Sequence, residues 1–368
     1  MKKRLITAWL AIVMIVSMLC VTGFTGPAAG TESVLVGGVE MVSGTYLANG
    51  ASFTVTQKPE GGYAYYSDGV LTLHNFVYEG TGNPYLIYAK RDGFTVRLEG
   101  ENSLKATGKS AVAVYVQADR LTMENGAQAG KLIIRGGDRG IYFNGNTSES
   151  TLFFNSGTYE ISDTALTGII GYGHIVIFDG AFGIDAAADM GIQVLSGMLS
   201  INKGDIRIHS TNACLRANRI TINDGNVVLC SVNGCLATGS SVFYMNGGQL
   251  DATATVGTVL ANAGGMLVGD HLNISAAVNY ADAPGEYLAS EATTYQRIVI
   301  APDYVSGDAN LDGKVNLDDA TAVFYHVNGM TTLTENARIA ANAVRDGAID
   351  LRDATALFYY INGLTTEL

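Results

Sequence analysis

Apolar and polar residues alternate along most of the chain in short segments, and these segments recur at a regular spacing. The alternation has a period of two residues, which predicts β-strands with one buried face. The intervals are mostly 21 to 27 residues, with one longer step from Leu121 to Leu152. A spacing this constant predicts a repeat architecture. The segments begin near Val70, Phe94, Leu121, Leu152, Ile175, Leu199, Ile220, Val242 and Leu267.

Each period divides into three short strands. Residues 191–210 read GIQVLS, MLSINKG and DIRIHS, and the next two periods divide in the same way. Asn or Asp followed by Gly marks the same corner at Asp179-Gly180, Asp224-Gly225 and Asn246-Gly247, which favours a turn there. These features predict a mainly β fold, a parallel, right-handed β-helix of about nine three-stranded coils.

The coils must stack because one coil cannot bury its own apolar face. We expect Ile206 and Ile208 to lie against Val227 and Leu229 of the following coil. A β-sandwich is the alternative fold, but its strands would not keep one register over about two hundred residues. Residues 33–66 are expected to cap the first coil, and residues 287–300 to cover the last.

The last part of the chain contains one motif twice. The segment Gly307 to Gly329 reads GDANLDGKVNLDDATAVFYHVNG, and it returns as ANAVRDGAIDLRDATALFYYING from Ala341 to Gly363, at an offset of 34 residues. Each copy is a loop followed by an apolar helix signature that ends in Asn-Gly, a helix C-terminal cap. No helical pattern precedes either loop, so each copy is expected to form half of an EF-hand.

Oxygen-bearing side chains in the first loop have the spacing of an EF-hand-type calcium loop. Calcium takes about six to eight oxygen ligands, and a central glycine, here Gly313, allows the sharp turn that gathers them. Position 12 is Asp319, where an ordinary EF-hand has Glu. The predicted ligands are the side chains of Asp308, Asn310, Asp312, Asn316 and Asp319 and the carbonyl oxygen of Lys314.

The second loop departs from this pattern. Asn342 replaces Asp at position 1, and Val344 at position 3 has no side-chain oxygen. We therefore expect firm calcium binding in the first loop and weak binding in the second. The predicted ligands of the second loop are the side chains of Asn342, Asp346, Asp350 and Asp353 and the carbonyl oxygen of Ala348.

Two such loop-helix units in tandem, with Asp at position 12, make the segment from about Ser306 to Leu368 resemble a type I dockerin. The resemblance implies a calcium-dependent module that docks its protein to a cohesin of a scaffold or cell-surface protein, as in a cellulosome. It also implies that positions 10 and 11 of each loop help to select the cohesin. These residues are Leu317 and Asp318 in the first loop and Leu351 and Arg352 in the second, so the leucine is kept and the charge is reversed.

The N-terminus has the pattern of a secretory signal peptide. Lys2, Lys3 and Arg4 precede an apolar run from Leu5 to Val21, and small and turn residues follow. A single membrane anchor is the alternative, because the run is close to the minimum length of a span. We expect a secreted protein with no membrane insertion after cleavage. The expected parts are a signal peptide in residues 1–30, a β-helix domain with an N-terminal cap in 31–303 and a dockerin domain in 304–368.

Charge and cysteine content narrow the function. The formal net charge is -12, and removal of the signal peptide would take away three basic residues, which argues against nucleic acid or an anionic membrane as partner. Three cysteines lie outside the signal peptide, Cys214, Cys230 and Cys235. An odd number leaves at least one free thiol, and one disulfide stays compatible with this count. We interpret the three as small buried residues.

The β-helix region resembles, less specifically, the β-helical modules of secreted bacterial carbohydrate-binding proteins. The resemblance implies a plant or cell-surface polysaccharide as ligand. Equivalent positions recur along one axis of a β-helix and can meet successive sugars, and aromatic rings supply flat apolar faces for them. Packing inside the coil is the alternative role of these rings. The candidate residues are Tyr63, Tyr65, Tyr66, Tyr78, Tyr85 and Tyr88.

A polysaccharide-degrading enzyme, a pectin or uronate lyase or a glycoside hydrolase, is the competing hypothesis. Aligned coils place Asp205, Arg207 and His209 outward on one strand, with Asp185 beside His209. Such a group has an acid, a base and a cation, but a solvated polar face explains it equally well. We therefore favour a non-catalytic role and keep the enzyme as the alternative. A structural adhesin or spacer is the third hypothesis.

Overall fold

The computed structural model describes residues 32–81, 84–186, 189–239, 242–261, 265–269 and 272–368. The predicted signal peptide, residues 1–30, lies outside them. The protein is mainly β, with 48% strand and 10% helix, and contains a β-solenoid of about eight turns. The sequence predicted about nine. The chain forms two compact units, Met1–Leu199 and Ser200–Leu368.

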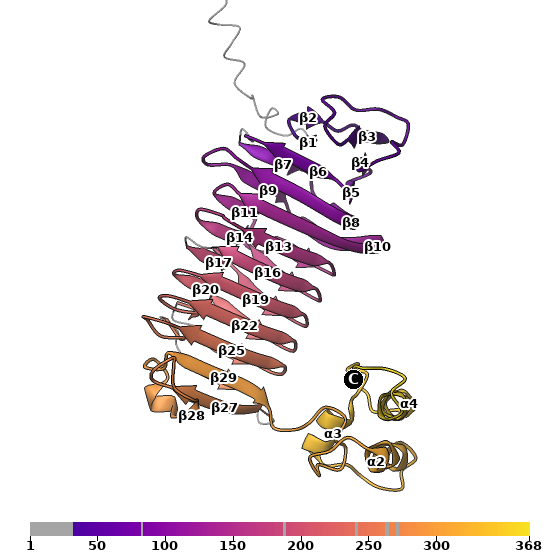
Figure 1. Ribbon diagram of the computed structural model, residues 1–368, viewed down its shortest axis with the longest axis vertical. Coiled ribbons are helices and arrows are strands. Elements are labelled where there is room, and N and C mark those ends of the chain that lie inside the picture. Colours follow the sequence, from indigo (N-terminus) through magenta and orange to yellow (C-terminus); the bar gives the residue numbers. More distant parts are fainter. Residues whose placement is uncertain (1–31, 82–83, 187–188, 240–241, 262–264, 270–271) are drawn as a thin grey trace, which may run out of the picture. The chain divides into compact units, whose positions relative to one another are not determined.

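The first unit contains coils of three parallel strands, drawn as stacked arrows in Figure 1. The strands of one sheet are β7 (Tyr85–Lys90), β9 (Val112–Ala118), β11 (Arg139–Gly145), β14 (Thr167–Tyr172) and β17 (Met190–Val194). A second row contains β5 (Val70–His74), the first part of β8 (Phe94–Ala106) and of β10 (Arg120–Gly136), β12 (Thr151–Phe154) and β15 (His174–Ile177). The third contains β6 (Val77–Gly80), the later parts of β8 and β10, β13 (Thr158–Ser162) and β16 (Ala181–Ala186).

The second unit repeats the arrangement, and β18 (Met198–Ile201) spans the boundary. Ile206 pairs with Val227 and Ile208 with Leu229, which confirms the predicted stacking. The strands are β19 (Asp205–Ser210), β22 (Asn226–Ser231) and β25 (Gln249–Ala254) in one row, β21 (Arg219–Ile222), β24 (Phe243–Met245) and β26 (Met266–Val268) in the next, and β20 (Ala213–Arg216) and β23 (Leu236–Ala237) in the third.

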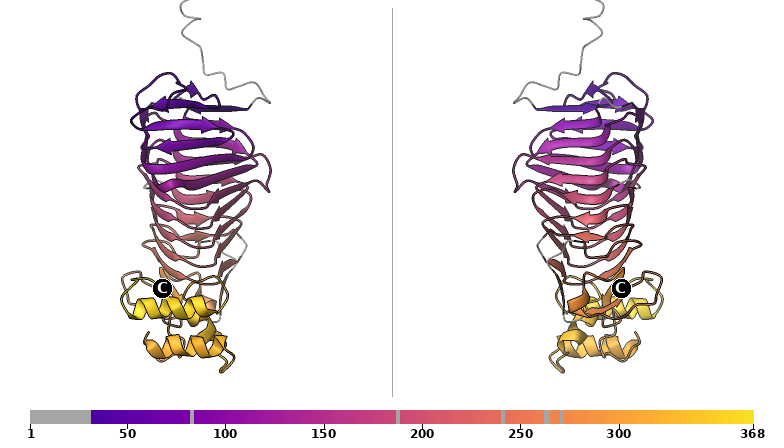
Figure 2. Two further views of the ribbon diagram at one scale, coloured as in Figure 1. Left: turned by 90° about the vertical axis from the view of Figure 1, so that its right-hand side faces the viewer. Right: turned by 90° about the vertical axis from the view of Figure 1, so that its left-hand side faces the viewer.

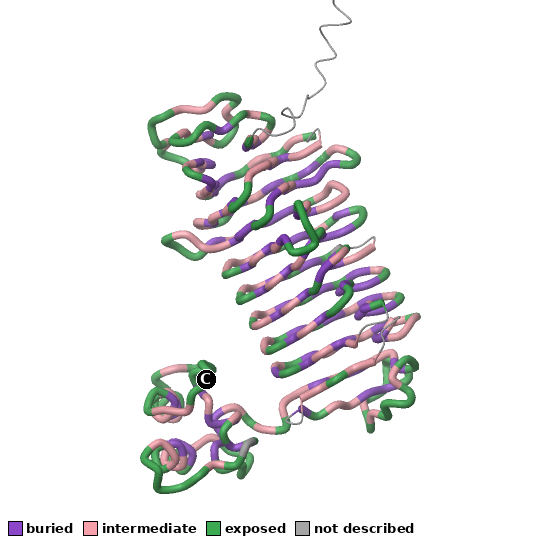
Figure 3. Tube along the Cα trace, turned by 180° about the vertical axis from the view of Figure 1, so that it is seen from behind, coloured by how far each residue is buried: buried purple, intermediate pink, exposed green. Residues whose placement is uncertain are grey.

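The core lies inside the coils. Along β19 the residues alternate between buried and more exposed positions, as a strand with one face toward the core must. Figure 3 shows this alternation along the coils as changes of colour. In the first unit the core includes an aromatic stack in which the rings of Tyr159 and Phe182 lie 4.8 Å apart, with Phe154 edge-on to both. The predicted inward positions are therefore the packed ones.

Antiparallel strands lie at the N-terminal side of the first unit's coils. The strand β1 (Ser33–Val36) pairs with β2 (Val39–Glu40) and with β7. The strands β3 (Thr45–Ala48) and β4 (Tyr63–Ser67) continue the sheet from β5. The antiparallel strands β1 and β4 end the rows of parallel strands that begin with β7 and β5, so they form the expected N-terminal cap.

Antiparallel strands also end the coils of the second unit. The strand β29 (Arg297–Pro302) pairs with β25 and with β27 (Leu272–Ala277), which also contacts β28 (Gly285–Glu286). A short 3-10 helix, η1 (Ala289–Glu291), lies between β28 and β29. The spacing predicted a last coil near Leu267. The row of β19, β22 and β25 does not continue into that coil, because the next neighbour of β25 is the antiparallel strand β29.

Glycine is required at one predicted corner of the second unit. Gly225 has φ +105°, and a Cβ atom there would lie 2.5 Å from the carbonyl oxygen of Gly204 in the preceding coil. Both the backbone angle and the close approach exclude a larger residue. The Asp-Gly pair at this corner therefore marks a place where two successive coils approach too closely for a side chain.

A buried asparagine holds a corner of the first unit. Asn102 is fully buried on β8, and its Oδ1 atom accepts the backbone N–H of Phe76 at 2.8 Å. Its Nδ2 atom donates to the carbonyl oxygen of Lys131 at 3.2 Å, in the next coil. One side chain therefore connects three successive coils, and the bond to the N–H of Phe76 is buried.

Replacement of Asn102 by Ala should lower the free energy of unfolding by about 2 to 4 kcal/mol, because it leaves the buried N–H of Phe76 without this partner and removes the bonds to part-buried carbonyl oxygens. Urea denaturation followed by circular dichroism measures the effect. Asn223→Ala is the matched control. Asn223 is exposed, and its side chain makes exposed hydrogen bonds to neighbouring coils, with Asn202 at 2.7 Å, Asn246 at 2.8 Å and the hydroxyl of Ser200 at 3.5 Å, so its loss should cost less. Equal costs would contradict the role of burial.

Candidate functional site

The C-terminal repeat forms three helices around a small core. The helices α2 (Leu317–Val327) and α4 (Leu351–Ile361) each follow a loop, and they lie side by side in Figure 2. Each begins with a capping box, in which Asn316 or Asp350 is the N-cap residue. The core residues are Ala309, Ala320, Val323, Ala341, Ala343 and Leu357.

The third helix corrects one expectation. The helix α3 (Glu335–Ala341) ends directly before the second loop, where the sequence indicated no helix. Thr334 caps it by accepting the backbone N–H of Ala337. The helix has only seven residues, too few to show a clear apolar period. The second loop therefore has a helix on each side, whereas the first follows a segment of bends and turns after β29.

The two loops share one scaffold, built on the aspartate at position 12. In the first loop Asp319 accepts the backbone N–H of Asn310 at 3.1 Å and of Asn316 at 2.8 Å. In the second loop Asp353 accepts the corresponding groups of Val344 at 3.0 Å and Asp350 at 2.9 Å. The carboxylate at position 12 thus holds the backbone of positions 3 and 9 together in each loop.

Oxygen atoms of the first loop gather around its centre. Asp308 accepts the backbone N–H of Asp312 at 3.0 Å and of Gly313 at 2.7 Å, and Gly313 has φ +84° at the predicted turn. Asn310 also accepts the N–H of Asp312, at 2.9 Å. These bonds bring the predicted ligands at positions 1, 3 and 5 into one loop.

Two carboxylates of the first loop are buried. Asp308 is 2% exposed and Asp319 is fully buried. Burial raises the pKa of Asp319, and the charges of Asp308 and Asp312 raise it further. A hard cation is the partner that such oxygens favour. The donor set of the first loop therefore fits calcium.

The second loop gathers its predicted ligands differently. Asn342 has a buried Oδ1 atom that has no hydrogen-bond partner among the described residues. Val344 is 42% exposed and contributes no side-chain oxygen, as expected. The guanidinium of Arg352 lies 2.6 Å from a carboxylate oxygen of Asp346 and 2.7 Å from one of Asp350. Two of the three predicted carboxylate ligands of the second loop are therefore paired with Arg352.

Carboxylates alone do not form a metal centre in either loop. Among the described residues, no group of three or more His, Cys, Asp or Glu side chains is arranged to hold a metal ion. The oxygen set proposed for the first loop also draws on the amides of Asn310 and Asn316 and on the carbonyl of Lys314. Calcium binding by the two loops thus stays a prediction.

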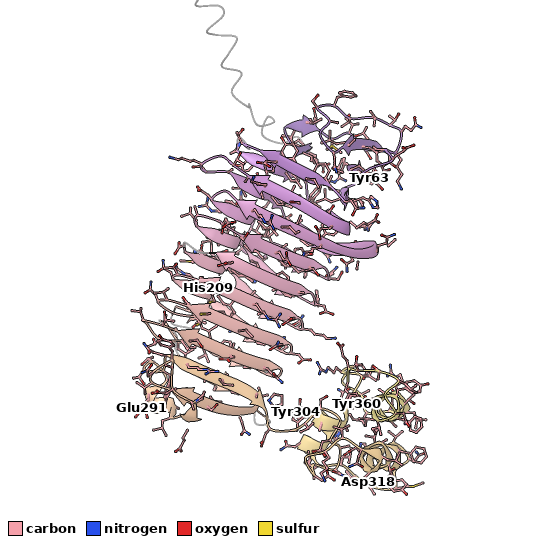
Figure 4. All side chains as sticks on the ribbon, in the orientation of Figure 1. Tyr63, His209, Glu291, Tyr304, Asp318 and Tyr360 are labelled. Atoms are coloured by element: carbon pink, nitrogen blue, oxygen red, sulfur yellow. The ribbon has the colours of Figure 1, made fainter. Side chains whose placement is uncertain are left out.

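The residues predicted to select a partner lie at the start of α2 and α4. Leu317 is 57% exposed and Leu351 is 53% exposed, and both Asp318 and Arg352 are exposed. Figure 4 labels Asp318 on α2 and Tyr360 on α4. The sequence interpretation missed a second matched set on the same helices. Exposed aromatic pairs recur at the offset of the repeat, Phe324 and Tyr325 on α2 and Phe358 and Tyr359 on α4.

The six candidate tyrosines do not form one cluster. Tyr63 and Tyr66 are buried, and Tyr66 packs near Phe94. Tyr65 stacks on Tyr46 in the cap, with ring centroids 4.3 Å apart. Tyr78 stacks on Phe76, and its hydroxyl donates to the carbonyl oxygen of Gly37 at 3.3 Å. For these four residues, packing in the cap and the first coil explains the ring.

Tyr85 and Tyr88 belong to a larger group, which we call the outer tyrosine row and which consists of Tyr85, Tyr88, Tyr115 and Tyr142. Tyr88, Tyr115 and Tyr142 occupy equivalent positions of β7, β9 and β11. The rings of Tyr88 and Tyr115 are parallel at 5.6 Å, Tyr85 stacks on Tyr115 at 4.4 Å, and Tyr142 meets Tyr115 edge-on at 5.2 Å. All four are half-buried on the outer face of the sheet.

Polar side chains accompany the outer tyrosine row. Lys90, Gln117 and Asn144 form the next outward row across the same three strands. The amide of Asn144 donates to the hydroxyl of Tyr115 at 2.9 Å, and burial raises the pKa of Tyr115 to about 12. The face therefore combines phenols, amides and the amine of Lys90, and the guanidinium of Arg139 lies over the Tyr142 ring, 5.7 Å from its centroid.

The group proposed for the competing enzyme lies on the surface of the second unit. Arg207 and His209 are exposed on β19, and Arg207 forms an ion pair with Asp205. Asp185 is exposed on β16 of the first unit, and its predicted place beside His209 stays a prediction. An exposed arginine paired with its own strand neighbour is typical of a solvated face.

The three cysteines lie in the second unit, and none of them forms a disulfide. Cys214 and Cys235 are buried, and the Cys214 thiol contacts the carbonyl oxygen of Cys230 at 3.2 Å. Burial raises the pKa of Cys230. Two of the three therefore act as small core residues, as interpreted from the sequence.

No helix in the described part of the chain has the length and apolar character that a membrane span requires. No family model, curated protein or solved structure matches the chain. The function must therefore be argued from the chemistry of the site residues.

Proposed function

We propose that this chain is a secreted, non-catalytic polysaccharide-binding protein that is docked to a cohesin by its C-terminal module. The observation that carries the binding role is the outer tyrosine row, which crosses three coils beside a row of amide and amine groups. Sugars present C–H faces and hydroxyl groups, so a ligand surface for them needs aromatic rings and hydrogen-bonding groups together. The first unit offers both on one sheet face.

The spacing of this surface suits an extended ligand. Neighbouring strands lie about 4.8 Å apart, so equivalent side chains recur at that interval along the coils. A polymer of sugars that runs across β7, β9 and β11 would meet Tyr88, Tyr115 and Tyr142 in turn. A small ligand would meet only one or two of these positions.

The docking role is supported by the twofold repetition in residues 304–368. Both loops carry the same position-12 scaffold, and both following helices expose Leu at their start and an aromatic pair near their end. Calcium bound in the first loop would supply the cation that its buried carboxylates favour. Asp308, Asn310, Asp312, Asn316, Asp319 and the carbonyl of Lys314 are the residues that would hold it.

Capture on an immobilised cohesin tests the docking role. The full mature chain, passed over a panel of type I cohesins, should be retained in calcium and released by a chelator. Leu317→Ala and Leu351→Ala should weaken retention, because both side chains are exposed at the proposed contact. Retention that persists in the chelator, or a chain that no cohesin retains, would exclude calcium-dependent docking.

A further inference from the structure

The two loops of the C-terminal module have equal numbers of carboxylates among their predicted ligands, but they differ in one side-chain contact. Each loop has three aspartates among its predicted ligands, Asp308, Asp312 and Asp319 in the first and Asp346, Asp350 and Asp353 in the second. The residue at position 11 differs in charge, since it is Asp318 in the first loop and Arg352 in the second. Position 11 lies on the first turn of the helix that follows each loop.

Arg352 turns back over its own loop. Its Nη2 atom lies 2.6 Å from Oδ2 of Asp346 and 2.7 Å from Oδ2 of Asp350. Its Nε atom donates to both carboxylate oxygens of Asp350, at 3.1 and 3.0 Å, and its backbone N–H donates to the same residue at 2.7 Å. The guanidinium is a planar fork that suits carboxylates better than any other side chain.

These contacts involve the oxygens that a metal ion would need. Asp346 is at position 5 and Asp350 at position 9, and both are predicted calcium ligands. The corresponding oxygens of the first loop, on Asp312 and Asn316, accept backbone N–H groups of Lys314 and Asp318 and contact no arginine or lysine among the described residues. A second cation in the second loop would have to displace Arg352, because two positive charges would otherwise share the same oxygens.

We infer that Arg352 is a built-in cation of the second loop, which closes this loop in place of calcium, so that the chain binds one calcium ion where its repeat suggests two. The inference rests on the proposed calcium-dependent module and deepens it. Val344 adds to the effect because it removes one oxygen ligand. Asn342, at position 1, keeps a buried side-chain oxygen that has no hydrogen-bond partner in the described part of the chain and that an ion could use. Arg352 is then the main barrier to a second ion.

The contacts of Arg352 also affect the partner surface. A guanidinium held by Asp346 and Asp350 fixes the corner formed by Leu351 and Arg352, whereas the corresponding corner of the first loop carries Leu317 and the acidic Asp318. The two halves of the repeat therefore present unequal charges to one partner, and a cohesin with an acidic contact surface is expected to prefer the second half.

Calorimetric titration of the full mature chain with calcium chloride tests the inference. The wild type should bind one ion. Arg352→Gln should bind a second ion, with an affinity for the second loop at least about tenfold above that of the wild type, because the competing charge is gone. Arg345→Gln is the matched control. It removes the same charge from the same loop, but Arg345 donates to the carbonyl oxygen of Leu368 and not to a loop carboxylate, so the variant should keep one ion.

The outcomes separate this inference from the proposed function. Two equally tight ions in the wild type, or one ion in both the wild type and Arg352→Gln, would overturn the role of Arg352. A second ion in Arg345→Gln as well would show that net charge, and not the contact, decides the stoichiometry. If the wild type binds no ion and Arg352→Gln gains one, calcium-dependent docking fails while the role of Arg352 stands. No ion in either chain would overturn both.

Discussion

Asp319→Ala should abolish calcium binding by the chain and unfold much of its C-terminal module. The variant loses the buried carboxylate at position 12, a predicted calcium ligand, and with it the hydrogen bonds to the backbone of Asn310 and Asn316. Loss of these two bonds to a charged acceptor should cost about 3 to 6 kcal/mol even in a chelator. In calcium the difference should grow by about 2.7 kcal/mol at an ion concentration a hundred times the dissociation constant.

The matched variant is Asp353→Ala, which removes the equivalent carboxylate of the second loop. Asp353 is 1% exposed and makes the same two backbone contacts, to Val344 and Asp350. It should destabilise the module to a similar extent in a chelator, but it should leave the calcium-dependent part of the stability unchanged. Thermal melting of α2 and α4 with and without calcium measures both terms. If Asp319→Ala and Asp353→Ala changed the calcium response equally, the first loop would not be the main site.

Tyr115→Ala combined with Tyr142→Ala should lower the affinity of the chain for its polysaccharide by about tenfold or more. Each ring would contribute on the order of 1 kcal/mol through contact with sugar faces, and removal of both leaves a gap of two coils in the outer tyrosine row. Affinity electrophoresis measures the loss, and circular dichroism checks that the coils remain folded. A double variant that is folded and binds as the wild type does would exclude the outer tyrosine row as the ligand surface.

The matched control lies on another exposed face of the coils. Asp205→Ala combined with Arg207→Ala removes an ion pair of the second unit that we interpret as a solvated surface pair. Polysaccharide retention should be unchanged, and the free energy of unfolding should change by less than about 1 kcal/mol. Loss of retention in this variant would place the ligand surface on β19. It would also support the enzyme hypothesis, which uses the same residues.

The coil register was predictable because the apolar period is a direct consequence of stacking. Ile206 and Ile208 must face inward if Val227 and Leu229 do, since side chains alternate along every strand. The end of the stack was not predictable from the same period. Near Leu267 the apolar pattern continues, but β25 already pairs with the antiparallel β29, and pairing direction leaves little trace in the alternation of apolar residues.

The candidate binding surface was only half predictable. Tyr85 and Tyr88 were selected because they stand close to other tyrosines in the sequence, yet their structural neighbours are Tyr115 and Tyr142. Tyr88, Tyr115 and Tyr142 are equivalent residues of successive coils, 27 residues apart at each step. In a solenoid, neighbours are found by adding the period to the residue number, and this signal was present in the sequence.

The loops show what a spacing motif contains and what it omits. The positions of Asp312 and Gly313 predicted a turn, and the structure has it. The sequence also showed that Arg352 reverses the charge of Asp318. It did not show that the guanidinium returns to Asp346 and Asp350, because a flexible arginine at the start of a helix can face either the loop or the solvent.

Affinity electrophoresis of the full mature chain against a panel of plant polysaccharides, with an assay for unsaturated uronide products in the same samples, tests the central claim most directly. A polysaccharide-binding protein without catalytic activity should be retarded by at least one polymer and should release no product. Product formation would show a lyase. A chain that no polymer retards and that releases no product would contradict the binding role and leave a spacer or adhesin.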